Sequence, residues 1–257
     1  MNHEYPILTW KRSAKHKGML IVFLGPVGVG KSTITGLLIR ILNTLGIKIH
    51  KTFLKSFHGL SYALWASTAK LLAIPGGCAP WYAIPKCGYT SLARALTLLS
   101  AYLDAFINLP ARILVSKLFK FVGFMVLSEE YLYTALYDYL YSYIALNIRL
   151  RISTLTPLIV MYTLAIAHKP DMVVLLDADV RELLSRWRVR GYGDPQLRYV
   201  KLQRVFLRRI PCVEVLYINT SNRSASEIAV FILRAIMEKA HLNKRAGPKA
   251  FPYDKKI

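Results

Sequence analysis

The sequence predicts an α/β fold of three layers, in which a five-stranded parallel sheet lies between helices. Five short apolar segments alternate with longer stretches whose apolar residues recur at helical spacing. Strands of a parallel sheet are buried on both faces, so they read as continuous apolar runs. The 257 residues, with 54% hydrophobic content, suffice for one such domain with an insertion.

The five expected strands span residues 19–24, 47–54, 121–127, 172–176 and 214–218. A mostly helical insertion, about 58–120, separates the second strand from the third. It reads as a helix over 60–74, a loop rich in proline and glycine up to Gly88, a helix over 89–109 that stops before Pro110, and a helix over 111–120. The domain is expected to span 19–240, between a basic arm (1–18) and a basic, loosely ordered tail (241–257).

After the third strand, residues 131–150 have helical spacing. Their tyrosines cover more than one face of the helix, so some rings are expected to line a pocket and others to belong to the core. These tyrosines stand at positions 131, 133, 137, 139, 141 and 143.

A phosphate-binding loop joins the first strand to the next helix. Residues 25–32 read Gly-Pro-Val-Gly-Val-Gly-Lys-Ser, which is a complete G-x-x-x-x-G-K-[ST] motif between a strand and a helix. Backbone N–H groups of such a loop surround phosphate oxygens, and the helix N-terminus favours the anion. The motif predicts a three-layer P-loop NTPase fold that binds ATP through Gly25, Gly28, Val29, Gly30, Lys31, Ser32 and Thr33.

The motif also predicts the chemistry of the donor side. Lys31 is expected to reach the β- and γ-phosphates, and Ser32 to ligate Mg²⁺. The third strand ends in Ser-Glu-Glu-Tyr, residues 128–131, where Glu129 is a second candidate for holding the metal. The alternative is that Ser128 only caps the next helix, although the third position after it is not Glu or Gln.

Two further segments carry candidate residues. Arginines of the stretch 181–190 lead into a glycine-bounded loop, which is typical of a lid over a transferring phosphoryl group; Arg186 and Arg190 are the catalytic candidates. The alternative is a solvated basic helix face. Asp179 is expected to cap that helix. At the end of the second strand, Lys55 is a candidate for an acceptor phosphate and Phe53 or Phe57 for stacking on a base; the alternatives are ordinary surface and core roles.

Together these residues resemble the thymidylate kinase-like family of P-loop nucleoside monophosphate kinases. The resemblance rests on the segments 25–32, 128–131, 170–179, 186–191 and 217–221. It implies an ATP·Mg²⁺ donor, a monophosphate acceptor and a possible homodimer. Lys55 stands where the family usually has an arginine, and Phe57, Glu130 and Tyr131 are the other candidates for the acceptor side. The family has Asp-Arg-Tyr where this chain has Glu129, Glu130 and Tyr131, and Glu130 cannot replace an arginine that contacts phosphate.

Three functions therefore stay open. The first is transfer of the ATP γ-phosphoryl group to a nucleoside monophosphate. The second keeps this chemistry for a nucleoside or another small hydroxylated acceptor, with Glu129 or Glu130 accepting the proton. The third is a non-catalytic NTP-binding module that acts on a nucleic acid or an acidic membrane surface, which the net charge of +21 would attract.

Composition restricts the remaining classes. Mean hydropathy is +0.33, yet 131–148 contains Asp138 and 152–167 is short and contains Pro157, so no clean membrane span is expected and a cytoplasmic location is favoured. The three cysteines have no metal-binding spacing. Free thiols are favoured, although Cys78 and Cys87 flank a segment short enough for a disulfide.

Overall fold

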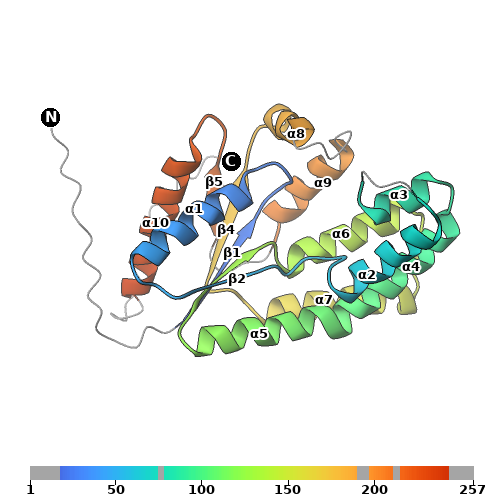
Figure 1. The fold of residues 1–257 in the computed structure, drawn as a ribbon, viewed down its shortest axis with the longest axis horizontal. Coiled ribbons are helices and arrows are strands. Elements are labelled where there is room, and N and C mark those ends of the chain that lie inside the picture. Colours follow the sequence, from blue (N-terminus) through green and yellow to red (C-terminus); the bar gives the residue numbers. More distant parts are fainter. Residues whose placement is uncertain (1–17, 75–77, 190–196, 211–214, 243–257) are drawn as a thin grey trace.

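The computed structural model describes residues 18–74, 78–189, 197–210 and 215–242. Its sheet is fully parallel with the strand order β2-β3-β1-β4-β5, and helices cover both faces (Figure 1). The strands are β1 (Met19–Leu24), β2 (Ile49–Thr52), β3 (Met125–Glu129), β4 (Met172–Asp177) and β5 (Val215–Asn219). The predicted fold class, five parallel strands between helices, is confirmed.

One or more helices follow each strand along the chain. They are α1 (Lys31–Thr44), α2 (Leu60–Leu71), α3 (Pro80–Lys86), α4 (Thr90–Leu103), the π-helical turn η1 (Asp104–Asn108), α5 (Leu109–Phe121), α6 (Leu132–Ala145), α7 (Ile152–Ala167), α8 (Val180–Val189), α9 (Leu197–Arg208) and α10 (Ala225–Leu242). Helices α2 to α7 form a lobe that extends beyond the carboxyl ends of β2 and β3, as Figure 1 shows.

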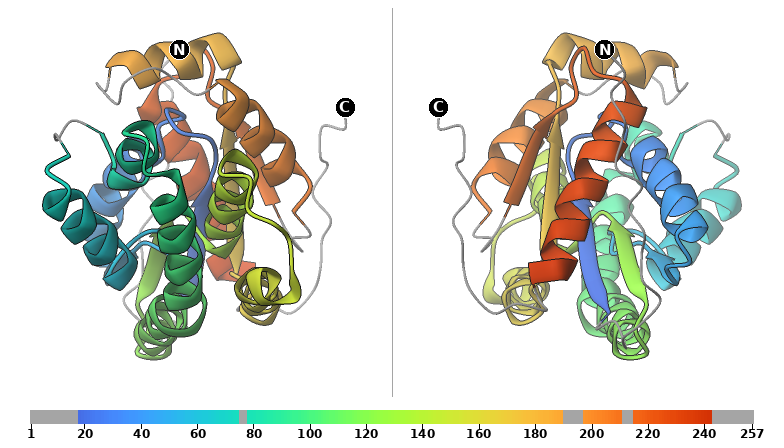
Figure 2. Two further views of the ribbon diagram at one scale, coloured as in Figure 1. Left: turned by 90° about the vertical axis from the view of Figure 1, so that its right-hand side faces the viewer. Right: turned by 90° about the vertical axis from the view of Figure 1, so that its left-hand side faces the viewer.

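Alternate residues of the central strand enter two separate cores. Val22 and Leu24 of β1 pack with the lobe of α2 to α7, whereas Ile21 and Phe23 pack with α1, α8 and α10. All four side chains are almost fully buried. This is why β1 reads as an unbroken apolar run, and why its carboxyl end is rigidly placed between the two layers. Figure 2 shows α10 lying beside α1 along that second face.

Several predicted boundaries are wrong, and proline accounts for two of them. Residues 80–86 form α3 rather than a loop, because Pro80 stands in the first helical turn, where its missing N–H costs nothing. The chain also continues as helix through Pro110, because the preceding turn is the wider π-helical η1. As a result, 90–121 is one unbroken helical stretch.

The sequence predicts no clean membrane span, but this unbroken helical stretch is a candidate for one by length and composition. Within the described part of the chain, Thr90–Phe121 is long and apolar enough to cross a membrane by length and composition, and a third of its most apolar window is buried. It packs against α2, α3, α6 and α7.

The other boundary errors are shorter. Strand β3 begins at Met125 rather than at Phe121, because α5 continues through Phe121. Strand β2 is shorter than predicted, and the helix predicted over 131–150 ends at Ala145. Residues 1–17, 190–196 and 243–257 lie outside the described residues, and α10 continues to Leu242, two residues into the predicted tail. The division into arm, domain and tail otherwise stays a prediction.

Candidate active site

The loop between β1 and α1 has the backbone that the phosphate-binding motif requires. Gly25 and Gly28 have φ values of 147° and 89°. A Cβ atom on Gly25 would lie 2.3 Å from the carbonyl oxygen of Leu176, and one on Gly28 would lie 3.0 Å from that of Leu183. A residue with a side chain would be strained at both positions, because φ is positive and because its Cβ atom would lie too close to a carbonyl oxygen. The helix that follows begins at Lys31, so its free N–H groups face the loop.

Lys31 lies at the centre of the loop and is buried. Its Nζ donates to the carbonyl oxygens of Gly25 (2.5 Å) and Pro26 (3.1 Å), and it forms an ion pair with Glu130 Oε1 at 2.9 Å. The ammonium group thus lies between the loop and the end of β3, which is where the γ-phosphate of a bound nucleotide is expected.

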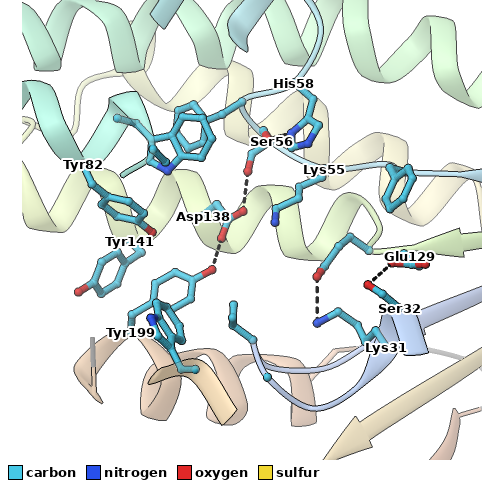
Figure 3. A pocket seen from close by; sticks show the side chains of 18 of the residues that line it. Lys31, Ser32, Lys55, Ser56, His58, Tyr82, Glu129, Asp138, Tyr141 and Tyr199 are labelled. Carbon is cyan, nitrogen blue, oxygen red and sulfur yellow. Dashed lines mark hydrogen bonds and ion pairs between the residues drawn. The ribbon is translucent and has the colours of Figure 1, made fainter. Parts of the chain in front are cut away.

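Ser32 and Glu129 form the candidate metal site. The Ser32 hydroxyl donates to Glu129 Oε2 at 2.6 Å (Figure 3), and Lys51 Nζ lies 2.6 Å from Glu129 Oε1. A hydroxyl and a carboxylate beside a phosphate loop fit Mg²⁺, which takes few protein ligands and keeps water and phosphate oxygens as the others. No group of three or more His, Cys, Asp or Glu suited to a metal occurs among the described residues.

Glu130 is directed at Lys31 by an unusual backbone. Its φ is 75°, its N–H donates to the carbonyl of Phe23 at 3.1 Å, and Ser128 Oγ donates to its carbonyl at 2.7 Å. Ser128 therefore stabilises this turn and does not cap α6, whose N-cap residue is Tyr131. Burial raises the pKa of the Glu130 carboxyl, but the charges of Lys31 and Lys55 outweigh burial and hold this pKa below its usual value.

The second oxygen of Glu130 is enclosed by the protein. Oε2 is buried and makes no hydrogen bond of good geometry among the described residues. Buried carboxylate oxygens are normally satisfied, and the Thr134 side chain is the nearby donor, since it also lowers the pKa of Glu130.

These residues border a cavity of about 450 Å³, a volume typical of small-ligand sites. The loop after β2 contributes Lys55, Ser56, Phe57 and His58 to its wall. Aromatic rings make up much of the rest, namely Phe53, Trp81, Tyr82, Tyr141, Trp187 and Tyr199. Only part of the tyrosine stripe faces this cavity: Tyr141 lines it, whereas Tyr139 and Tyr143 belong to the core.

Asp138 is a site residue that the sequence analysis did not select. It lines the cavity, and its two oxygens accept hydrogen bonds of 2.5 Å from Ser56 Oγ and Tyr199 OH (Figure 3). Burial raises the pKa of its carboxyl. A signal was present, because Asp138 is the only charged residue between Glu130 and Arg149 in the sequence. A lone carboxylate in an otherwise apolar helix is costly unless it has partners.

The other predicted residues have different positions relative to the cavity. Arg186 pairs with Glu182 and lies over the phosphate loop, with Nη1 3.5 Å from the carbonyl of Gly28. Tyr131 does not reach the cavity: its hydroxyl donates to the carbonyl of His168, and its ring lines a separate, smaller cavity. Arg190 lies outside the described residues. Asp179 caps α8 as expected, accepting from the N–H of Arg181 at 2.8 Å.

Cys78 and Cys87 are both free and exposed in the structure, as the sequence favoured. Cys78 also borders the main cavity.

No protein-family model matches the chain, and no curated protein matches it either. Two solved structures of deoxyadenosine kinase from M. mycoides are similar in fold. The one with the products dCMP and a flexible dCDP aligns with a TM-score of 0.53 and 15% identity, over 86% of this chain and 100% of the other. The one with bound dCTP gives 0.49 and 14%, over 85% and 100%. The first alignment shows that this chain shares the fold of that deoxyadenosine kinase.

Proposed function

We propose that the protein is an ATP-dependent kinase that phosphorylates a hydroxyl group of a nucleoside-like acceptor. Lys31 and the loop N–H groups bind the phosphates of ATP, and Ser32 and Glu129 would hold Mg²⁺, whose charge offsets that of the β- and γ-phosphates. The acceptor oxygen attacks Pγ, its proton passes to Glu130, and the bond from Pγ to the bridging oxygen breaks to release ADP.

The observation that carries this proposal is the position of Glu130. Its carboxylate lies 2.9 Å from Lys31 Nζ at the wall of the cavity, so it lies beside the phosphates that Lys31 would bind. A carboxylate there repels a phosphorylated acceptor, but it suits a hydroxyl that has to lose its proton. When Lys31 turns to the phosphates of ATP, one of the two charges that lower the pKa of Glu130 is drawn away, while burial continues to favour its protonated form.

The far end of the cavity supports an aromatic acceptor that carries polar groups. Trp81, Tyr82 and Tyr141 offer ring faces and edges, and Asp138 lies among them as a hydrogen-bonding group. A deoxyadenosine kinase that binds dCMP and dCDP has the same fold, so the fold accommodates acceptors of this kind.

An ADP-release assay over matched nucleosides and nucleoside monophosphates tests the proposal. Turnover with at least one nucleoside, and little with its monophosphate, is the expected result. Turnover confined to monophosphates would replace this proposal with the second candidate.

The second candidate is a nucleoside monophosphate kinase, with thymidylate among the possible acceptors. It is favoured by Lys55, whose ammonium group lies at the cavity wall with no ion pair among the described residues. Lysine provides a point charge for phosphate but lacks the bidentate geometry of arginine. An NTP-binding module acting on a nucleic acid or an acidic membrane is the third candidate; its support is the net charge of +21.

We also propose that two copies pair through α4 and α7. These neighbouring helices, with the turn η1, expose apolar side chains seven residues apart, at Leu92 and Leu99 of α4 and Phe106 of η1, and at Ile152, Ile159 and Ile166 of α7. Such spacing keeps one face of each helix apolar, which suits packing against a second pair of helices.

A further inference from the structure

The loop that follows β2 carries the acceptor side of the cavity, yet it has little structure of its own. Residues 53–59 contain neither helix nor strand. Phe57 has a φ of 54°, a left-handed conformation that is unfavourable for a residue with a large side chain, and Gly59 has a φ of 65°. Contacts from outside the loop must therefore hold it in this shape.

Asp104, in the π-helical turn η1, provides the most deeply buried of these contacts. Its carboxylate is fully buried and accepts four hydrogen bonds. Oδ2 accepts from the Phe57 N–H (2.9 Å) and from Tyr139 OH (2.6 Å). Oδ1 accepts from Ser61 Oγ (2.6 Å) and from Asn108 Nδ2 (2.6 Å). Two donors on each oxygen fill the capacity of a carboxylate, so this group links the loop to α2 and α6.

Two more residues of the same helical stretch bind the loop backbone. Asn108 Nδ2 donates to the carbonyl of His58 at 3.0 Å, and Arg112 Nη1 donates to the carbonyl of Phe53 at 2.6 Å. Asp104, Asn108 and Arg112 are four residues apart, and together they contact the loop near both of its ends.

The link also reaches the other wall of the cavity. Tyr139, which donates to Asp104, is adjacent in sequence to Asp138, which accepts from Ser56 of the loop. Two neighbouring loop residues are thus held by two carboxylates, one from η1 and one from α6. A shift of the loop would move Lys55, Ser56 and Asp138 relative to Glu130.

We infer that Asp104, Asn108 and Arg112 are positioning residues that fix the acceptor loop, 53–59, without touching the acceptor. None of the three lines the cavity, whereas residues 55–58 of the loop do. The consequence for catalysis rests on the proposed kinase function, but the hold on the loop does not.

Arg112→Ala is the principal test, because this side chain is partly exposed and its removal leaves the core intact. We expect the KM for the acceptor to rise about threefold to tenfold, the range that one hydrogen bond gives, while kcat and the Kd for ADP stay within twofold. Arg112→Lys should recover part of the loss. The matched control is Arg94→Ala, which removes a similar bond from Arg94 Nε to the carbonyl of Leu146, remote from the loop.

Hydrogen–deuterium exchange of the amides of residues 54–59 tests the hold on the loop without any need for turnover. We expect faster exchange in Arg112→Ala and in Asp104→Asn, and no change in Arg94→Ala. Exchange and KM equal to those of the control would overturn the inference, and so would a parallel loss of ADP affinity. If exchange rises but the wild-type protein phosphorylates no acceptor, the inference that these residues hold the loop is supported and the proposed function is refuted.

Discussion

Replacement of Glu130 by glutamine separates the two candidate acceptors most directly. The change keeps the shape of the side chain and removes both its charge and its ability to take a proton. For a hydroxyl acceptor, we expect kcat to fall about 10²- to 10³-fold, or about 2.7–4.1 kcal/mol of transition-state free energy. The loss stays in the lower part of the range for general bases because glutamine still orients the hydroxyl.

The same change has the opposite effect on the donor side. At 2.9 Å and an effective dielectric constant of about 20, the attraction between Lys31 and Glu130 is about 6 kcal/mol before the cost of desolvation. A bound nucleotide has to compete with this ion pair. We therefore expect Glu130→Gln to bind ADP more tightly, by up to about tenfold.

Steady-state ADP release at saturating ATP, together with calorimetric ADP binding, measures both effects. Glu238→Gln, on the exposed surface of α10, is the charge-matched control. A kcat within twofold of wild type with a nucleoside would refute the assignment of Glu130 as the base. A gain of activity toward a monophosphate would instead show that the carboxylate excludes the phosphorylated acceptor.

Further predictions concern other parts of the molecule. Lys31→Met should lower ADP release at least about 10²-fold, and a value near wild type would contradict its placement at the γ-phosphate. Asp138→Asn should raise the acceptor KM about tenfold without changing ADP affinity, because an amide offers one oxygen to the two hydroxyls of Ser56 and Tyr199; a fall in kcat alone would refute this. Burial raises the pKa of Asp177, but hydrogen bonds from Arg204 and Arg208 outweigh it and hold the pKa below the usual value. Its ionised form therefore stabilises the fold above about pH 4. Asp177→Asn should cost about 3 kcal/mol of unfolding free energy at pH 7, and this difference from wild type should shrink as the pH falls below 4. Urea unfolding in which the difference in unfolding free energy does not change with pH would contradict this. Leu99→Lys with Ile159→Lys should give monomers in analytical ultracentrifugation, and an unchanged mass would refute pairing through α4 and α7.

The sheet and the donor loop were predictable because local patterns determine both. Strand β1 was predicted at its observed bounds, since its residues are apolar on both faces and the glycine motif follows directly. The helices of the insertion were harder. Whether Pro110 ends a helix depends on the turn before it, and that turn, η1, carries Asp104, whose partners Phe57 and Tyr139 are distant in sequence.

The acceptor side was only partly predictable for a similar reason. Lys55 and Glu130 follow strands, and the carboxyl ends of parallel strands meet at one edge of the sheet, so their proximity follows from topology. Asp138 lies in the middle of a helix, and its partners Ser56 and Tyr199 are distant in sequence. Tyr131 shows the converse error, because the left-handed turn at Glu130 directs the two side chains to different cavities.

The distribution of charge argues against a highly anionic acceptor despite the overall charge of +21. With nucleotide bound, Lys31 serves the phosphates, and Lys51 is already paired with Glu129. Within the described lining of the acceptor side, Lys55 then faces two buried carboxyl groups, Glu130 and Asp138. A monophosphate would add about two negative charges beside these two carboxyl groups, with Lys55 as the unpaired cation of the described lining, whereas a neutral nucleoside adds none. This distribution of charge supports the proposed uncharged hydroxyl acceptor over a monophosphate.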